Sequence, residues 1–125
     1  MKFNADVGES FGVWLMGNDE ALMPHLDMAN VACGGHASDP VTMQRTVRLA
    51  KTHGVTVGAH PSYPDLLGFG RRPLLIPHAE AVVHMLAQVG ALVAIAAMED
   101  TAVTYVKPHG ALYNCMMDDP DLMAA

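Results

Sequence analysis

Basic residues are scarce in this sequence. Seven lysines and arginines stand against thirteen acidic residues, which gives a formal net charge of −6 over 125 residues, and no basic run stands out. Because nucleic acid binding needs a concentrated patch of positive charge, this composition argues against a nucleic acid partner.

Cysteine is almost absent as well. Cys33 and Cys115 lack the paired spacing of a zinc knuckle, and residues 1–6 show no signal-peptide pattern, so we expect free thiols in a cytoplasmic protein. Small buried hydrophobic residues are the favoured interpretation of both cysteines. Cys33 ends a predicted strand near the predicted site, and a nucleophilic role for it is the alternative.

Aromatic residues and long apolar runs are also few. Aromatics make up 6% of a sequence that is 51% hydrophobic, which predicts an aliphatic core whose gaps are filled by ten methionines. We expect no apolar run to reach the roughly 18–20 residues of a membrane span, and hence no membrane partner. The length predicts one domain, residues 1–125, that is large enough for a core of its own.

Four short apolar runs predict strands that all end in the same way. The runs cover residues 2–6, 28–33, 55–59 and 103–106, and a polar or titratable residue with a nearby glycine or proline follows each of them. In parallel α/β proteins the carboxyl ends of the strands meet at one rim, where the chemistry is placed. The residues expected at this rim are Asp6, His36, His60, Lys107 and His109, of which Lys107 and His109 are predicted to share one face of the last strand.

Helix signals separate the strands. Asp39 and Pro40 predict the start of a helix that ends near His53, and a second helix is expected from Pro77 to Met98. Its predicted apolar stripe is Val82, Leu86, Val89, Val93 and Ala96. The order of β and α units predicts a parallel α/β fold that is about half of a closed barrel of roughly 250 residues. The open sheet edge of such a half-barrel favours pairing, so a homo-oligomer is one expectation.

A long connection follows the third strand, from His60 to about Ile76. Connections of this length in compact domains tend to be functional. Arg71 and Arg72 lie in it and fit two interpretations, a grip on a substrate carboxylate or phosphate, or ties that hold the loop to carbonyls and acids.

Five motifs along the whole chain closely resemble the LamB/YcsF family. They are residues 4–9 (NADVGE), 29–40 (ANVACGGHASDP), 58–65 (GAHPSYPD), 68–72 (GFGRR) and 106–114 (VKPHGALYN). Ser38 stands where the family pattern has glycine, and Ala5 where cysteine is frequent. Both are small residues, and neither change removes a candidate catalytic group.

The resemblance implies a seven-stranded, TIM-like barrel of the glycoside hydrolase/deacetylase type, of which this chain is the N-terminal half. It also implies a hydrolase acting on cyclic amides. The expected reaction is ATP-dependent opening of the 5-oxoproline lactam to L-glutamate, in a complex with two further 5-oxoprolinase subunits. ATP binding by that complex, a link to carbohydrate metabolic processes and a divalent metal ion are further expectations of the family type.

Opening a lactam requires a polarised carbonyl, a nucleophile and a proton for the departing nitrogen. The predicted catalytic residues are Asp6, His60, Lys107 and His109, with either histidine as the base, because histidine titrates near neutral pH. Lys107 with Arg71 or Arg72 would bind the developing anion. The predicted substrate-binding residues are Glu9, Asn30, Arg71 and Arg72, although Asn30 could instead orient its neighbours.

Two other interpretations of the rim residues stay open. Asp6, His36, His60 and His109 could bind a divalent metal, since one carboxylate with two or three imidazoles is a common hydrolytic set. Alternatively, Asp6 and Lys107 form a buried ion pair while the histidines bond loop backbone. The alternative functions are therefore a metal-dependent amidase or deacetylase that does not use ATP, and a non-catalytic module that binds a small acid.

Overall fold

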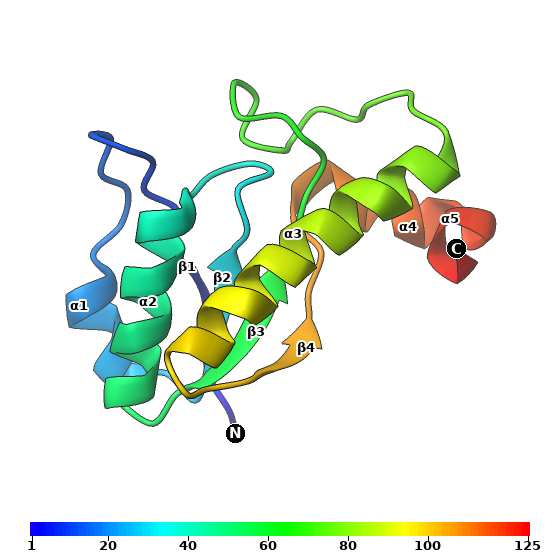
Figure 1. Ribbon diagram of the computed structural model, residues 1–125. Coiled ribbons are helices and arrows are strands. Elements are labelled where there is room, and N and C mark those ends of the chain that lie inside the picture. Colours follow the sequence, from blue (N-terminus) through cyan, green and yellow to red (C-terminus); the bar gives the residue numbers. More distant parts are fainter.

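The computed structural model describes residues 1–125 and contains one parallel sheet (Figure 1). Its strands are β1 (Asn4–Val7), β2 (Met28–Ala32), β3 (Thr56–His60) and β4 (Val103–Val106). They lie in sequence order, and each pairs in parallel with the next. The predicted α/β class and the parallel arrangement are confirmed.

Helices lie between and after the strands, and two of them begin and end close to the predicted places. The helices are α1 (Asp19–Leu22), the 3-10 helix η1 (Met23–His25), α2 (Pro40–Thr52), α3 (His78–Met98), α4 (Gly110–Asp118) and α5 (Pro120–Ala124). Asp39 caps α2 as expected, because its carboxylate accepts hydrogen bonds from the backbone of Val41 and Thr42. Helix α4 was not predicted. Gly110, which the sequence pattern presents only as a strand breaker, has φ +57° and opens this helix.

One face of the sheet packs against helices. Figure 1 shows α2 and α3 lying side by side over this face, and the main core fills the space between the two layers. The core is aliphatic, as predicted: its fully buried members include Val31, Val47, Ala59, Leu92 and Ala96. A second, smaller cluster around Tyr63, Ala81, Ala111, Leu112 and Leu122 packs α4 and α5 near the start of α3.

The opposite face of the sheet is polar. Asp6, Asn30, Gly58 and Tyr105 lie in one row across all four strands, because the register pairs each of them with the next. Side chains of a strand alternate between its two faces, so the same alternation that sends Val7, Val31 and Ala59 to the core sends this row to the other side. The polar face leads to the rim at which the strands end.

The predicted apolar stripe of α3 is confirmed in part, because Ala96 is fully buried and Val89 packs against the main core. The fully buried residues of this helix are Ala81, Leu92 and Ala96, whereas Leu86 and Val93, assigned to the buried stripe from the sequence, are 66% and 46% exposed. The sequence of α3 is apolar on nearly every side, so periodicity alone cannot show which side faces the sheet.

Helix α3 also corrects an expectation about length. It has 21 residues and a mean hydropathy of 2.0, so by length and composition alone it could cross a membrane. Core helices of globular domains can have the same length and composition. In this fold Leu92 and Ala96 of α3 are fully buried in the main core.

Core packing of α3 gives a test of this orientation. Leu92→Ala should lower the free energy of unfolding by about 2–5 kcal/mol, because it removes buried methyl groups and leaves a cavity. Leu86→Ala on the exposed side of the same helix should change it by less than about 0.5 kcal/mol. Urea unfolding of both variants measures the difference, and equal losses would contradict this orientation of α3.

Candidate active site

The fold brings the predicted site residues together at the carboxyl ends of the strands. His60 is the last residue of β3, Lys107 and His109 follow β4, and His36 follows β2. Lys107 lies one residue beyond β4, so it and His109 belong to the connection to α4 and not to the strand itself. The rim predicted from the strand ends is therefore present, with contributions from all four strands.

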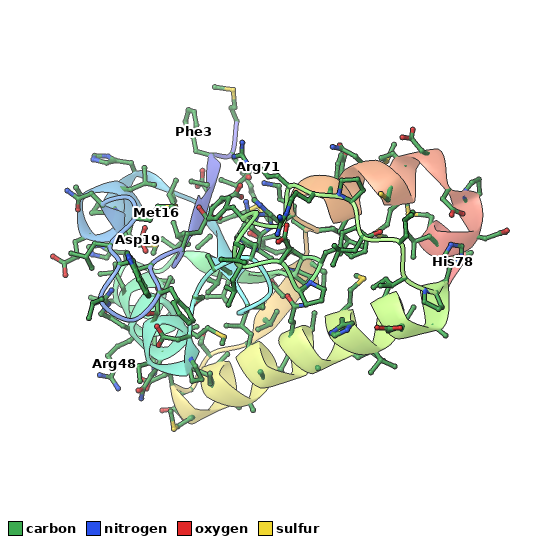
Figure 2. All side chains as sticks on the ribbon, turned by 90° about the horizontal axis from the view of Figure 1, so that it is seen from above. Phe3, Met16, Asp19, Arg48, Arg71 and His78 are labelled. Carbon is green, nitrogen blue, oxygen red and sulfur yellow. The ribbon has the colours of Figure 1, made fainter.

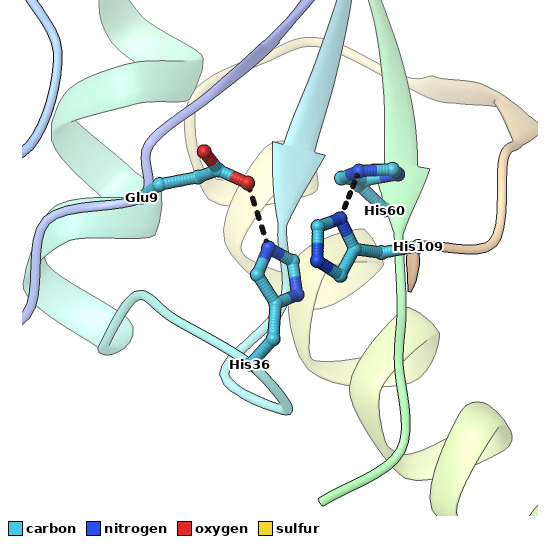
Figure 3. Close-up of side chains that lie close together, drawn as sticks. All are labelled: Glu9, His36, His60 and His109. Carbon is cyan, nitrogen blue, oxygen red and sulfur yellow. Dashed lines mark hydrogen bonds and ion pairs between the residues drawn. The ribbon is translucent and has the colours of Figure 1, made fainter. Parts of the chain in front are cut away.

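Three histidines form a buried cluster at this rim (Figure 3). The rings of His36 and His109 are stacked, with centroids 3.7 Å apart and an interplanar angle of 9°. The ring of His60 meets both edge-on, at 5.4 Å from His36 and 4.9 Å from His109. Phe69 covers the pair from the connection after β3, with its ring edge-on to His36 and His109 at 5.0 and 5.2 Å.

The partners of His60 and His109 determine where their protons lie. Nδ1 of His60 is 2.5 Å from the carbonyl oxygen of Lys107, and Nε2 of His109 is 2.9 Å from that of Phe69, so each of these nitrogens carries a hydrogen. The two remaining nitrogens, Nε2 of His60 and Nδ1 of His109, face each other at 3.0 Å. Neither of these two nitrogens carries a hydrogen while both rings are neutral, so one proton taken up by the pair would lie between them. This geometry suits a group that accepts a proton and returns it.

Protonation of His109 is unfavourable. Burial, followed by the charges of His36 and His60, lowers the pKa of His109 from 6.5 to about 4. His109 therefore remains able to accept a proton well below neutral pH.

Asp6 contacts three other residues at the rim. Its Oδ1 accepts hydrogen bonds from Nζ of Lys107 at 2.7 Å and from Nδ2 of Asn30 at 2.8 Å, while its Oδ2 lies 3.3 Å from Nε2 of His60. Burial raises the pKa of Asp6, but hydrogen bonds from His60, Lys107 and Asn30 outweigh it and hold this pKa well below its usual range. The ion pair between Asp6 and Lys107 considered from the sequence is thus present, and both side chains are partly exposed.

Glu9 is the carboxylate that joins the histidine cluster. Its Oε1 lies 2.8 Å from Nε2 of His36, and one ligand atom from each of Glu9, His36, His60 and His109 lies within 4.8 Å of the others. The sequence prediction placed Asp6 in this set, but Asp6 is held by Lys107 and Asn30.

The cluster meets the chemical requirements of a divalent metal site. Three imidazoles and one carboxylate are a typical donor set for Zn²⁺ and related ions. Nδ1 of His36 is buried and has no hydrogen-bond partner, which is uncommon for a buried polar atom and would be relieved by a bound ion. The residues present therefore fit the metal ion that the family type implies.

A pocket of about 420 Å³ opens beside these groups and is lined by Asp6, His60, Arg71, Lys107, His109 and residues of α4. A slightly larger pocket of about 460 Å³ lies between α2 and the connection after β1, and its lining includes Met16, Asp19 and Arg48. Figure 2 shows these three residues on one side of the molecule, away from Arg71. Because the larger pocket contains none of the rim residues, we place the substrate site in the smaller one.

The two neighbouring arginines have different partners. Arg72 forms an ion pair with Asp65, with Nε 3.1 Å from Oδ2 and Nη2 in contact with Oδ1, and this pairing lowers the pKa of Asp65 to about 2. Arg71 lines the pocket, and its guanidinium carbon lies 5.6 Å from the centre of the Phe69 ring. Of the two interpretations offered by the sequence, the structural tie describes Arg72, and the pocket position describes Arg71.

Two other residues have little opportunity to contact a substrate. Asn30 is buried, and its side-chain amide is bonded to Asn4, Asp6 and Tyr105. Cys33 is buried as well, and burial raises the pKa of its thiol to about 12, which disfavours a nucleophilic thiolate.

Backbone contacts hold the connection after β3 against the rim. The backbone N–H of His109 donates to the carbonyl of Pro61 at 2.8 Å, and that of Ala111 donates to the carbonyl of Gly70 at 2.9 Å. Gly70 has φ +64°, and a side chain there would come within 2.8 Å of Cβ of His36. Sequence reasoning did not assign Phe69 to the site. Gly70 beside it, which permits this close approach, is the local signal for it.

These features define a parallel α/β protein whose acid, base and cationic groups lie at the rim where this class places its active sites. The chain belongs to the LamB/YcsF family, whose sequence model matches residues 1–125.

Curated relatives are strongly similar over the whole chain. A 5-oxoprolinase subunit from Vibrio cholerae is 58% identical over 125 residues, which cover 100% of this chain and 51% of the relative. The corresponding 5-oxoprolinase subunit from Chromohalobacter salexigens is 60% identical over 120 residues, covering 96% of this chain and 48% of the relative. The chain spans about half the length of the curated relatives it matches.

A solved structure supports the fold. The chain superposes with a TM-score of 0.94 and 45% identity on a lactam utilization protein from Thermus thermophilus, covering 97% of this chain and 49% of that one. The coverage agrees with four β/α units forming about half of a larger α/β structure.

The lowered pKa of His109 predicts a pH dependence of stability. The unfolded chain protonates this residue near pH 6.5 and the folded chain only near pH 4, so the unfolded state binds more protons between these values. Stability should therefore fall as the pH is lowered through this window, and His109→Asn should reduce the slope. Urea unfolding at a series of pH values measures it, with exposed His25→Asn as the control. An unchanged slope in His109→Asn would contradict the assignment.

Proposed function

We propose that this chain forms part of an ATP-dependent 5-oxoprolinase, which hydrolyses the lactam of 5-oxoproline to L-glutamate. The supporting observation is the pocket in which the His60–His109 pair lies beside the cationic groups of Lys107 and Arg71. The identity of the substrate comes from the relatives of 56–60% identity, which are named as 5-oxoprolinase subunits.

Opening of the lactam ring uses one water molecule and breaks one bond of the ring. Water adds to the lactam carbonyl carbon, the ring carbon–nitrogen bond breaks, and the departing nitrogen gains a proton. The His60–His109 pair takes the proton from the water and returns a proton to the nitrogen. Lys107 and Arg71 bind the substrate carboxylate and the oxygen on which negative charge develops.

ATP would raise the reactivity of the lactam. Transfer of its γ-phosphoryl group to the lactam oxygen breaks the terminal phosphoanhydride bond, releases ADP and makes the ring carbon a better electrophile. Ring opening then leaves an acyl phosphate, which a second water molecule hydrolyses to the carboxylate and inorganic phosphate. We assign the phosphoryl transfer to two partner subunits. The relatives are named as single subunits of 5-oxoprolinase, which supports a complex of several chains. We further propose that the complex is cytoplasmic.

A second candidate function is a metal-dependent amidase or deacetylase. The observation that favours it is the unpartnered Nδ1 of His36 within the cluster of Glu9, His36, His60 and His109. These four residues would hold the ion, which would polarise a carbonyl and activate water without ATP. In this case Asp6 and Lys107 orient His60 and the substrate and do not bind the ion.

Glutamate release from 5-oxoproline tests the first function. The assembled enzyme should release glutamate only with ATP, and His109→Ala should reduce kcat by about 100-fold or more, because general acid–base catalysis contributes about 10²–10⁴. Exposed His25→Ala is the matched control. Release without ATP, or full activity of His109→Ala, would contradict the proposal. A module that only binds small acids would retain 5-oxoproline binding in His109→Ala and would show no turnover in any form.

Zinc titration tests the second function. A metal centre should bind one Zn²⁺ per chain in isothermal calorimetry, and Glu9→Gln or His36→Asn should weaken the affinity by at least about tenfold through loss of a ligand. His78→Asn, at an exposed ion pair with Asp119, is the control. The absence of saturable binding in the unsubstituted chain would exclude this centre.

A further inference from the structure

The polar face of the sheet contains a chain of hydrogen bonds that ends on Asp6. The hydroxyl of Tyr105 in β4 lies 2.7 Å from Oδ1 of Asn30 in β2. Nδ2 of Asn30 donates to Oδ1 of Asn4 at 3.0 Å and to Oδ1 of Asp6 at 2.8 Å. Because Asn30 is only 1% exposed, these partners replace water for its whole amide group.

The direction of each bond follows from Asp6. An ionised carboxylate only accepts hydrogen bonds, so the amide nitrogen of Asn30, and not its oxygen, faces Asp6. The amide oxygen then faces Tyr105, whose hydroxyl must donate. Burial, together with the charge of Asp6, raises the pKa of Tyr105 to about 12, which keeps this donor protonated.

As a consequence, the two carboxylate oxygens of Asp6 have different partners. Oδ1 receives the donors of Asn30 and Lys107, and Oδ2 is left to face Nε2 of His60 at 3.3 Å. We infer that Tyr105 is a positioning residue for the reaction: acting through Asn30, it fixes the Asp6 carboxylate in the orientation that holds His60. This inference rests on the proposed function for its catalytic effect, but the geometry that it describes does not.

Gly58 makes the position of Tyr105 accessible. The sheet register pairs the two residues, and a Cβ atom at Gly58 would lie 2.2 Å from ring atoms of Tyr105. The register of β3 with β4 shifts between Val57 and Gly58. Because of this shift, Val103 pairs with Val57 on the core face while Tyr105 pairs with Gly58 on the polar face. The ring can therefore lie over the backbone of β3 and reach Asn30 in the strand beyond it.

Steady-state kinetics of the assembled enzyme test the catalytic role. Tyr105→Phe, which removes one oxygen atom, should lower kcat about tenfold with little change in KM. Asn30→Ala should lower kcat further, and the double variant should be no worse than Asn30→Ala alone, since Tyr105 acts through Asn30. Tyr63→Phe removes the hydroxyl of a buried tyrosine in the second cluster and should retain full kcat. Additive losses, or a change confined to KM, would overturn the inference.

A spectroscopic measurement separates this inference from the proposed function. In ¹⁵N NMR of the chain, Tyr105→Phe and Asn30→Ala should shift the Nε2 resonance of His60, and Tyr63→Phe should not. If the unsubstituted enzyme releases no glutamate, the proposed function fails and the NMR shifts alone decide the positioning role. An Nε2 resonance of His60 that is unchanged in both Tyr105→Phe and Asn30→Ala would overturn it.

Discussion

The carboxylate of Asp6 connects the two edges of the sheet. Asp6 lies in β1 and Lys107 follows β4, so two strands separate them, yet their side chains meet at 2.7 Å. Neighbouring strands lie about 4.8 Å apart, and a flat sheet would hold β1 and β4 about 14 Å apart. The ion pair therefore fits a sheet that curves toward its polar face, as strands of a barrel do. The same carboxylate reaches β2 through Asn30 and β3 through His60, so one group contacts residues of all the other strands or of the segments that follow them.

The two faces of the sheet explain which parts of the fold the sequence could predict. The strands and the rim follow from short apolar runs with polar ends, and these were found because their pattern is local. The buried side of α3 was found only in part, because Leu86 and Leu92 look alike in the sequence and only contact with the sheet distinguishes them. Helix α4 was missed because Gly110 gives the same signal whether it ends a strand or, with positive φ, begins a helix.

Prediction of the candidate site from the sequence was limited in the same way, at the level of single side chains. His36, His60, Lys107 and His109 could be proposed from their places after the strands. The exchange of Asp6 for Glu9 beside the histidines depends on side-chain directions that the strand order does not contain. The two arginines have different positions because Arg72 pairs with Asp65, a partner that the sequence pattern does not identify. Phe69 contributes to His109 a backbone carbonyl, which every residue type offers, so apart from the neighbouring Gly70 the sequence does not mark it.

The connection after β3 is fastened to the rim by its backbone. The carbonyls of Pro61 and Gly70 receive the backbone hydrogens of His109 and Ala111, and Leu66 and Leu67 remain exposed. Backbone hydrogen bonds of this kind do not depend on most side chains of the loop. Substitutions at exposed positions of the loop can therefore accumulate while the histidines stay in place. Such a loop can change its exposed surface in small steps, because these changes do not require the histidine cluster to be rebuilt.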